Sequence, residues 1–82
     1  MNRQDVYKLI DGERDYQDSL AHHSTEADAN FSVADWVIFI EEHVLQAKNR
    51  VYYLEPEKAL EQVRKIAALA VACMEHNDTN ER

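Results

Sequence analysis

Hydrophobic residues recur along most of the chain at the three- and four-residue spacing of an amphipathic α-helix. This pattern predicts one helix at about residues 4–20, a second at about 33–54 and a third at about 56–76. A polar loop at residues 21–32 separates the first two helices, and a polar tail occupies residues 77–82. Because the break between the second and third helices is short, we expect them to form a long antiparallel hairpin. The pattern therefore predicts a single all-α domain over residues 1–82.

The first helix carries two polar residues on the side that should face a core. Its stripe consists of Val6, Leu9, Ile10, Glu13, Gln17 and Leu20, which share one helical face. A carboxylate on such a stripe needs a partner or water, because burying it alone is costly. Alternatively, the helix rotates or ends near Gly12, so that Glu13 is exposed. The pattern leaves both possibilities open, and with them the continuity of the helix through Gly12.

The loop at residues 21–32 contains two adjacent histidines and the start signal of the second helix. His22 and His23 are weak evidence of a metal site, because adjacent histidines on a loop do not form a ligand set by themselves. Ser32 is a typical N-cap residue, and Asp35 takes the place of the usual Glu or Gln of a capping box. The second helix should therefore begin at residue 33.

The second helix is hydrophobic nearly all round. A heptad-like seam runs along it through Val33, Val37, Ile40, Val44, Ala47, Val51 and Leu54. We take as candidate interface residues its larger hydrophobic side chains Trp36, Phe39, Leu45, Tyr52 and Tyr53. A helix of this kind needs burial on all sides, and a chain of 82 residues has too little other material to provide it. We therefore expect a dimer or higher homo-oligomer, in which partner chains complete a helical bundle.

Composition supports an all-α protein of the cytoplasm. One glycine and one proline are too few for the turns of a sheet protein of this size. The only cysteine, Cys73, cannot form an internal disulfide, which fits a reducing compartment. Nine Lys and Arg against sixteen Asp and Glu give a net charge of −7, which disfavours nucleic acid as a partner. The sequence shows no leader and no hydrophobic run of about 18 residues, so we expect no association with a membrane.

Three segments of the chain resemble small phage-encoded proteins of the MazG-like type. They are GERDYQD at residues 12–18, SVADWVIFIEEHVLQA at residues 32–47 and VRKIAALAVACMEHN at residues 63–77. The resemblance implies an all-α oligomer in the cytoplasm of a host cell. Active members of that group are nucleoside triphosphate pyrophosphohydrolases. They hold Mg²⁺ with acids of an EExxE-type motif on one helix and an ExxD-type motif on the next.

The metal-binding motifs of that family are incomplete in this sequence. With Glu41 and Glu42 as the acid pair, the third acid position falls on Leu45. On the following helix, Arg64 and Lys65 stand where acids are expected. Lysine and arginine can contact a phosphate, but they cannot replace a carboxylate as a metal ligand. The candidate metal ligands are Glu13, Glu41, Glu42 and His43, and the candidate contacts to a phosphate or a partner are Arg64 and Lys65.

These observations favour a small acidic binding protein without catalytic activity. Such a protein would bind a host protein or a nucleotide, as an inhibitor or by sequestering it, and it would need no cofactor. One alternative is a Mg²⁺-dependent nucleoside triphosphate pyrophosphohydrolase, for which the sequence offers no complete catalytic set. Another alternative is a purely structural homo-oligomer.

Overall fold

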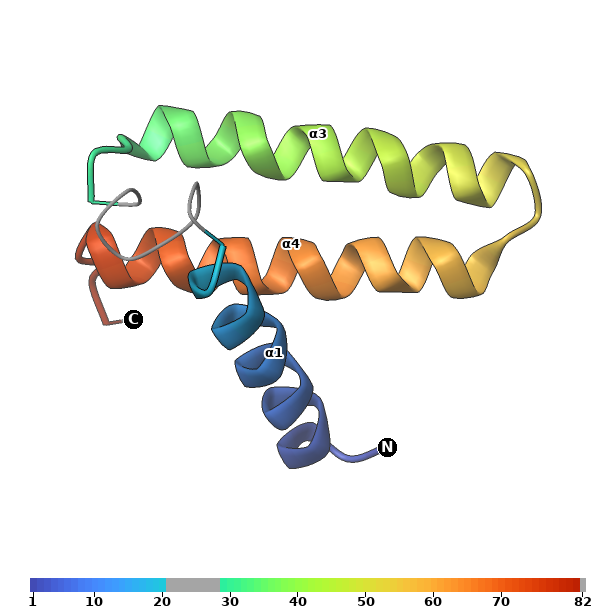
Figure 1. Cartoon of the computed structure of the whole chain (residues 1–82), viewed down its shortest axis with the longest axis horizontal. Helices are drawn as coiled ribbons and strands as arrows, with labels where there is room; N and C mark the ends of the chain where they lie inside the picture. The colour runs from blue at the N-terminus through green and yellow to red at the C-terminus, as the bar shows by residue number, and fades with distance from the viewer. Residues whose placement is uncertain (21–28, 82) are drawn as a thin grey trace.

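The described part of the chain, residues 1–20 and 29–81 of a computed structural model, is mainly helical. The helices are α1 (Arg3–Asp18), α3 (Val33–Tyr52) and α4 (Pro56–His76), and no strand occurs in these residues. Helices α3 and α4 run antiparallel side by side, as the sequence predicts (Figure 1). Within the same residues, no helix combines the length and the hydrophobicity that crossing a bilayer requires. His22 and His23 lie outside the described residues.

Helix α3 begins with the predicted capping box. The Asp35 amide donates to the Ser32 hydroxyl over 3.2 Å, and the Ser32 amide donates to the Asp35 carboxylate over 2.9 Å. These bonds satisfy amide groups that the first turn of a helix leaves without partners. The Ser32 amide, together with the Ser32 hydroxyl, which donates to the same carboxylate over 2.9 Å, lowers the pKa of the Asp35 carboxyl below its ordinary value of 3.8, because these bonds favour the charged form.

Helix α3 ends two residues before the predicted position, in a turn that a non-glycine residue occupies. Leu54 has a φ of 59°, in the left-handed region. The Glu55 amide donates to the Arg50 carbonyl over 2.8 Å, and the Leu54 amide donates to the Val51 carbonyl over 3.0 Å. This is the bond pattern of a Schellman motif, which normally has glycine at the position of Leu54. The turn leads directly into Pro56, where α4 starts at the predicted residue.

The α3–α4 hairpin is held together by an aromatic cluster and small residues. Its core consists of Trp36, Leu69 and Ala72, with Phe31, Phe39, Ile40 and Cys73 packed against it. The rings of Phe31, Trp36 and Phe39 meet edge to face, with centroids 5.0 to 5.9 Å apart. Alanine side chains on α4 allow α3 to approach closely. The prediction that Trp36 is an interface residue is wrong, because Trp36 is completely buried within its own chain.

The heptad-like seam of α3 packs on α4 only in part, because its residue Ile40 lies against the hairpin core whereas most of the seam does not. The packed side lies next to the seam and carries Trp36, Phe39 and His43. The seam residues Val37, Val44 and Val51 are 47 to 60% exposed. Trp36 determines this orientation, because burying the largest side chain removes most apolar area from water.

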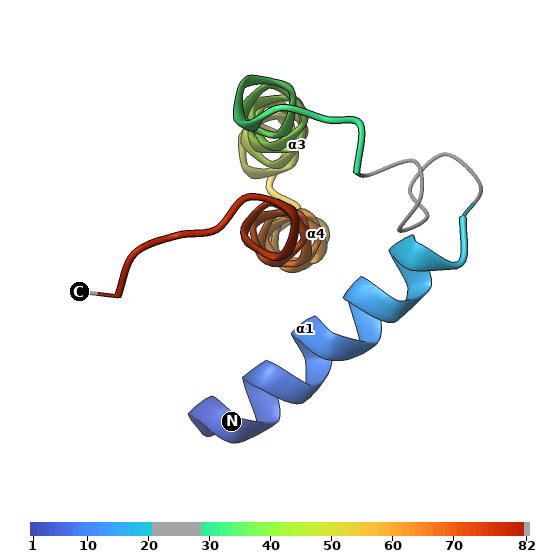
Figure 2. The same ribbon diagram turned by 90° about the vertical axis from the view of Figure 1, so that its left-hand side faces the viewer.

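Helix α1 lies across α4, on the side of α4 that faces away from α3 (Figure 2). It is continuous through Gly12, which answers the question that the sequence leaves open. It ends at Asp18, two residues before the predicted end. Glu13 and Gln17 face α4, which is the first of the two possibilities that the sequence leaves open, and each has a partner there. Helix α4 is thus the central element, because it contacts both other helices.

Candidate functional site

The four candidate metal ligands do not converge within the described part of the chain. Glu13 pairs with Arg64 on α4, whereas Glu41 and Glu42 are exposed on α3. His43 lies on the packed side of α3, where its Nδ1–H donates to the amide oxygen of Gln62 over 2.7 Å. Among the described residues, no three His, Cys, Asp or Glu side chains are grouped so that they could hold a metal ion.

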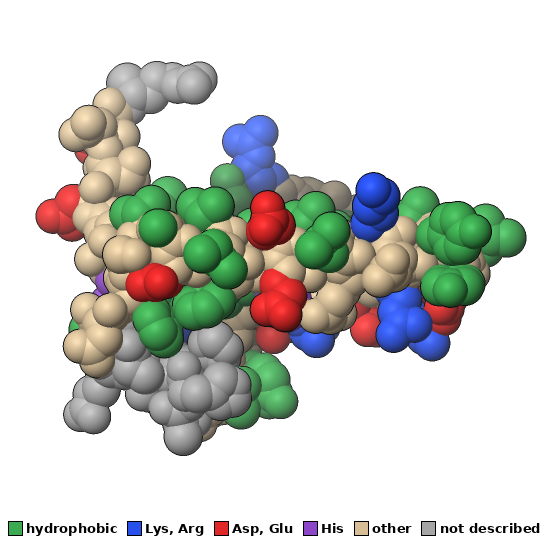
Figure 3. Space-filling model, turned by 90° about the horizontal axis from the view of Figure 1, so that it is seen from above, with side chains coloured by type: hydrophobic (Ala, Val, Ile, Leu, Met, Phe, Trp, Pro, Cys, Tyr) green, Lys and Arg blue, Asp and Glu red, His purple; other side chains and the backbone are tan. Residues whose placement is uncertain are grey.

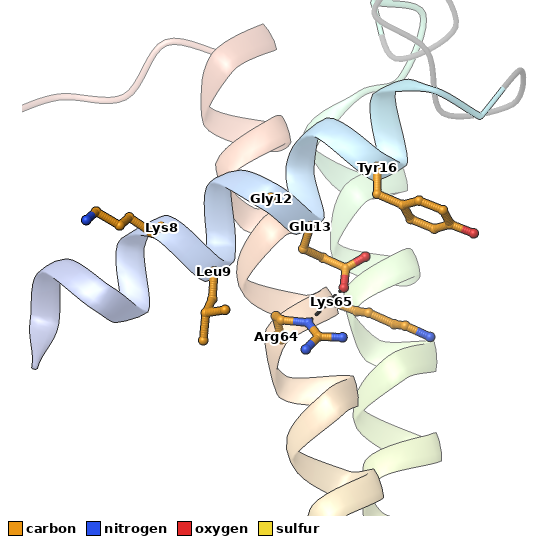
Figure 4. A pocket seen from close by; sticks show the side chains of 7 residues that line it. All are labelled: Lys8, Leu9, Gly12, Glu13, Tyr16, Arg64 and Lys65. Atoms are coloured by element: carbon orange, nitrogen blue, oxygen red, sulfur yellow. Dashed lines mark hydrogen bonds and ion pairs between the residues drawn. The ribbon is translucent and has the colours of Figure 1, made fainter. Parts of the chain in front are cut away.

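The two candidate phosphate contacts, in contrast, come together in a groove where α1 crosses α4. The groove has a volume of about 430 Å³. It is lined by Lys8, Leu9, Gly12, Glu13, Tyr16, Arg64 and Lys65 (Figure 4). Three of these residues are cationic and one is a carboxylate, so the groove carries excess positive charge on a chain of net charge −7. An anion that approaches this protein therefore finds an attractive potential here.

The ion pair between Glu13 and Arg64 forms the floor of the groove. Arg64 Nε lies 2.9 Å from Glu13 Oε1, and the Glu13 side chain is only 8% exposed. A carboxylate buried to this extent is stabilised by the guanidinium beside it. The Arg64 side chain remains 42% exposed, so its other N–H groups can still reach a ligand.

Lys65 is held in place through its own backbone. The Gln17 side-chain amide donates to the Lys65 carbonyl over 3.4 Å, which joins α1 to α4 at this point. The side chains of Lys65 and Tyr16 extend to the same side of the helix crossing, whereas Lys8 points to the other side (Figure 4). Tyr16 is 60% exposed, so its ring is accessible to a ligand near the Lys65 ammonium.

A second, hydrophobic pocket adjoins the groove. It has a volume of about 280 Å³ and lies between the first half of α1 and α4. It is lined by Met1, Val6, Leu9, Ile10, Leu60, Val63, Arg64 and Ala67. Leu9 and Arg64 line both pockets, so cationic and hydrophobic surfaces are continuous at the crossing.

The other side of α1 has the opposite charge. There a cleft of about 400 Å³ is lined by Asp11, Arg14, Asp15, Asp18, Val71 and Glu75. Arg14 is buried, and its Nε lies 3.0 Å from Glu75 Oε1 while its Nη1 lies 3.6 Å from Asp18 Oδ1. One cation against four carboxylates leaves this cleft negative. An anionic ligand is therefore attracted to only one of the two sides of α1.

The sequence pattern did not single out Lys8, Gly12 and Tyr16 as site residues. They are four residues apart, so they share one face of α1. That spacing is a usable signal, but its meaning depends on where α1 crosses α4. A Cβ atom added at Gly12 would meet no neighbouring atom within 4 Å, so this position borders open space in the groove.

The remaining candidate interface residues lie outside this groove. Leu45, Tyr52 and Tyr53 on α3 and its turn are exposed, and Phe39 is half-buried against the hairpin core. Comparison of the chain with protein-family models, with curated proteins and with solved structures finds no significant match.

Proposed function

We propose that this protein is a non-catalytic binding protein that takes a phosphorylated small molecule, of the nucleotide type, in the groove between α1 and α4. The observation that carries the proposal is the meeting of Arg64, Lys65 and Tyr16 in one groove of an otherwise acidic molecule. Bound in this way, the ligand is withdrawn from solution, which is a sequestering role.

The chemistry of the groove suits a phosphate next to a ring. Arg64 and Lys65 offer charged N–H donors, whose hydrogen bonds to phosphate oxygens are stronger than neutral ones. The exposed ring of Tyr16 offers a face on which a base can stack. The hydrophobic pocket next to Leu9 offers apolar surface to the rest of the ligand.

The positions of the carboxylates support binding rather than cleavage. Pyrophosphohydrolysis with Mg²⁺ needs several carboxylates directed at the same phosphates. Glu13 forms an ion pair with Arg64. Glu41 and Glu42 are on α3, which lies on the other side of α4 from the groove. The resemblance of the sequence to MazG-like proteins is a separate reason to expect a nucleotide-type ligand.

A titration with phosphorylated compounds tests the proposal. The panel comprises AMP, ADP, ATP, a cyclic mononucleotide and inorganic pyrophosphate, each with and without Mg²⁺. A ligand at 100 times its Kd adds about 2.7 kcal/mol to the free energy of unfolding, which thermal unfolding detects. At least one compound should stabilise the protein without Mg²⁺, and the absence of any stabilisation by the panel would contradict the proposal.

Three variants locate the binding site. Lys65→Gln removes a charge from the groove, and Gly12→Leu fills the groove with a side chain that favours the helix. Each should weaken binding at least about tenfold, since one charged hydrogen bond contributes about 1.5–3 kcal/mol. Lys58→Gln, which removes an equal charge from an exposed position outside the groove, is the matched control. Equal loss of binding in Lys65→Gln and Lys58→Gln would place the ligand elsewhere.

Incubation with nucleoside triphosphates and Mg²⁺ separates binding from catalysis. We expect no release of pyrophosphate. Release that is lost in Glu42→Gln would overturn the non-catalytic proposal and favour the pyrophosphohydrolase alternative.

A further inference from the structure

The outward face of α3 is hydrophobic and is covered by no other described part of the chain. Val37, Val44 and Val51 form one row on this face, and Ile38, Leu45 and Tyr52 form a second row beside it. Within each row the residues are seven apart, so they lie almost in line along the helix. All six are exposed. Figure 3 shows this face from above, with hydrophobic side chains along most of α3.

Two residues of opposite charge lie between these rows. Glu41 and Lys48 are also seven residues apart, so they share one line along the helix, within about 20° of each other. Both are exposed, and neither forms an ion pair with another described residue. The face therefore has a hydrophobic border on each side and one acidic and one basic position in its centre.

The chain as a whole exposes more surface than a monomer of its size. Its accessible surface is 6399 Å² at a mass of 9.6 kDa. The scaling relation for folded monomers gives about 5,100 Å² at this mass, so the excess is about 1,300 Å². A stable interface of standard size buries about 800 Å² on each partner. The excess is therefore large enough to contain such an interface.

We propose that α3 pairs in antiparallel orientation with α3 of a second copy of this chain, about a two-fold axis that passes between Val44 and Leu45. This axis places Glu41 opposite Lys48 of the second copy, and by symmetry Lys48 opposite Glu41 of the second copy. Val44 and Leu45 meet their own counterparts on the axis. Towards the ends, Val37 lies near Val51 of the second copy and Ile38 lies near Tyr52 of the second copy.

The charges select this orientation over the parallel one. In a parallel pair about a two-fold axis, Glu41 would face Glu41 and Lys48 would face Lys48, and like charges in an interface cost free energy. In the antiparallel pair both ion pairs form, and each hydrophobic row packs against the equivalent row of the second copy. In this pair the two α3 helices lie at the centre, and α4 of each copy lies on the far side of its own α3. The groove between α1 and α4 stays outside this interface, so the pairing does not depend on the proposed ligand.

Sedimentation velocity over a range of concentrations, with exchange of the two charges, tests the pairing. The wild-type chain is expected to be a dimer or an oligomer built from such dimers. Glu41→Lys and Lys48→Glu should each weaken the dimer at least about tenfold, because each places like charges opposite one another twice. The double variant restores both pairs with reversed polarity and should return to within about threefold of wild type. Glu42→Lys, an equal charge change about 100° away around the helix, is the control and should have little effect.

A monomeric wild-type chain would overturn the proposal. So would a dimer that both single variants weaken but that the double variant does not restore, since this result contradicts the register.

Disulfide cross-linking checks the position of the axis independently of charge. In a Cys73→Ser background, Leu45→Cys should form a cross-linked dimer under mild oxidation, because the two Leu45 positions meet across the axis. Gln46→Cys, one residue further along α3 and turned away from the face, should not. Circular dichroism verifies that each variant keeps its helices. Cross-linking through Gln46→Cys but not through Leu45→Cys would contradict this arrangement.

Discussion

The two sides of α4 hold their neighbouring helices by different means. On one side α3 packs through aromatic rings and alanines around Trp36. On the other side α1 is fixed near its C-terminal half by the Arg14–Glu75 and Glu13–Arg64 ion pairs and the Gln17 bond to Lys65. Hydrophobic packing contributes most of the stability of a small domain, whereas ion pairs near the surface contribute little. The polar side instead fixes the orientation of charged groups, which is what a binding site requires.

The largest expected effect tests the hydrophobic packing of α3 on α4. Trp36→Ala should lower the free energy of unfolding by about 3–5 kcal/mol, because it leaves a cavity in the centre of the hairpin core. Urea denaturation monitored by circular dichroism measures the change. Tyr53→Ala, which truncates an exposed ring in the turn, should change it by no more than about 0.5 kcal/mol. If Trp36→Ala lowered the free energy of unfolding as little as Tyr53→Ala does, the core of the hairpin would not be the main source of the stability of the fold.

The second-largest expected effect tests the polar contacts between α1 and α4. Glu75→Gln removes the carboxylate that faces the buried Arg14, and it should weaken the attachment of α1 to α4 by about 1–2 kcal/mol. Hydrogen exchange is the suitable measurement, because it reports local opening of α1 separately from global unfolding. Amides of α1 should exchange faster while those in the middle of α4 keep their protection. Glu57→Gln, at an exposed position in the first turn of α4, is the control. Equal changes in α1 and α4 would contradict a separate role for the ion pair.

A smaller effect, in the stabilising direction, is expected at the hairpin turn. Leu54 has a left-handed backbone, which costs a residue with a Cβ atom about 1–2 kcal/mol. Leu54→Gly should therefore raise the free energy of unfolding by about 0.5–1 kcal/mol, after the greater chain entropy of glycine is subtracted. Leu54→Ala, which keeps the Cβ atom, should not give this gain. Destabilisation by Leu54→Gly would show that the exposed leucine side chain contributes to packing.

The smallest effect concerns the capping box of α3. The hydrogen bonds from Ser32 lower the pKa of Asp35, so its carboxylate stabilises the fold above the ordinary value of 3.8. This contribution is lost as the pH falls below 3.8 and the carboxyl becomes protonated in the folded state. The stability difference between wild type and Asp35→Asn should therefore shrink as the pH is lowered from about 6 to about 3. A difference that stays constant over that range would contradict the role of the charge.

Local signals in the sequence predicted most of the fold. Ser32 and Asp35 marked the start of α3, and Pro56 marked the start of α4, because caps and proline act within a few residues. The early end of α3 was missed, since the left-handed conformation of Leu54 is usual for glycine and not for leucine. The helical stripe left open whether Glu13 faces the fold or the solvent, and the structure shows that Glu13 and Gln17 both contact α4.

Contacts between distant residues could not be predicted in the same way. Arg14 and Glu75 are 61 residues apart in the sequence, and nothing in the spacing of either residue points to the other. Trp36 is a candidate interface residue in the sequence because large aromatic side chains are enriched at interfaces, whereas the structure buries it between α3 and α4. Arg64 and Lys65 were singled out from the sequence, but their groove exists only because α1 crosses α4 next to them.

The most direct measurement of the proposed function is the location of the bound ligand. Amide chemical shifts of the ¹⁵N-labelled chain, followed by NMR during titration with the compound that stabilises it most, give this location. If the groove binds the phosphate, the largest changes will be at residues 8–16 and at Arg64 and Lys65, on both sides of the helix crossing. Changes confined to α3, or spread evenly over the chain, would contradict binding in the groove.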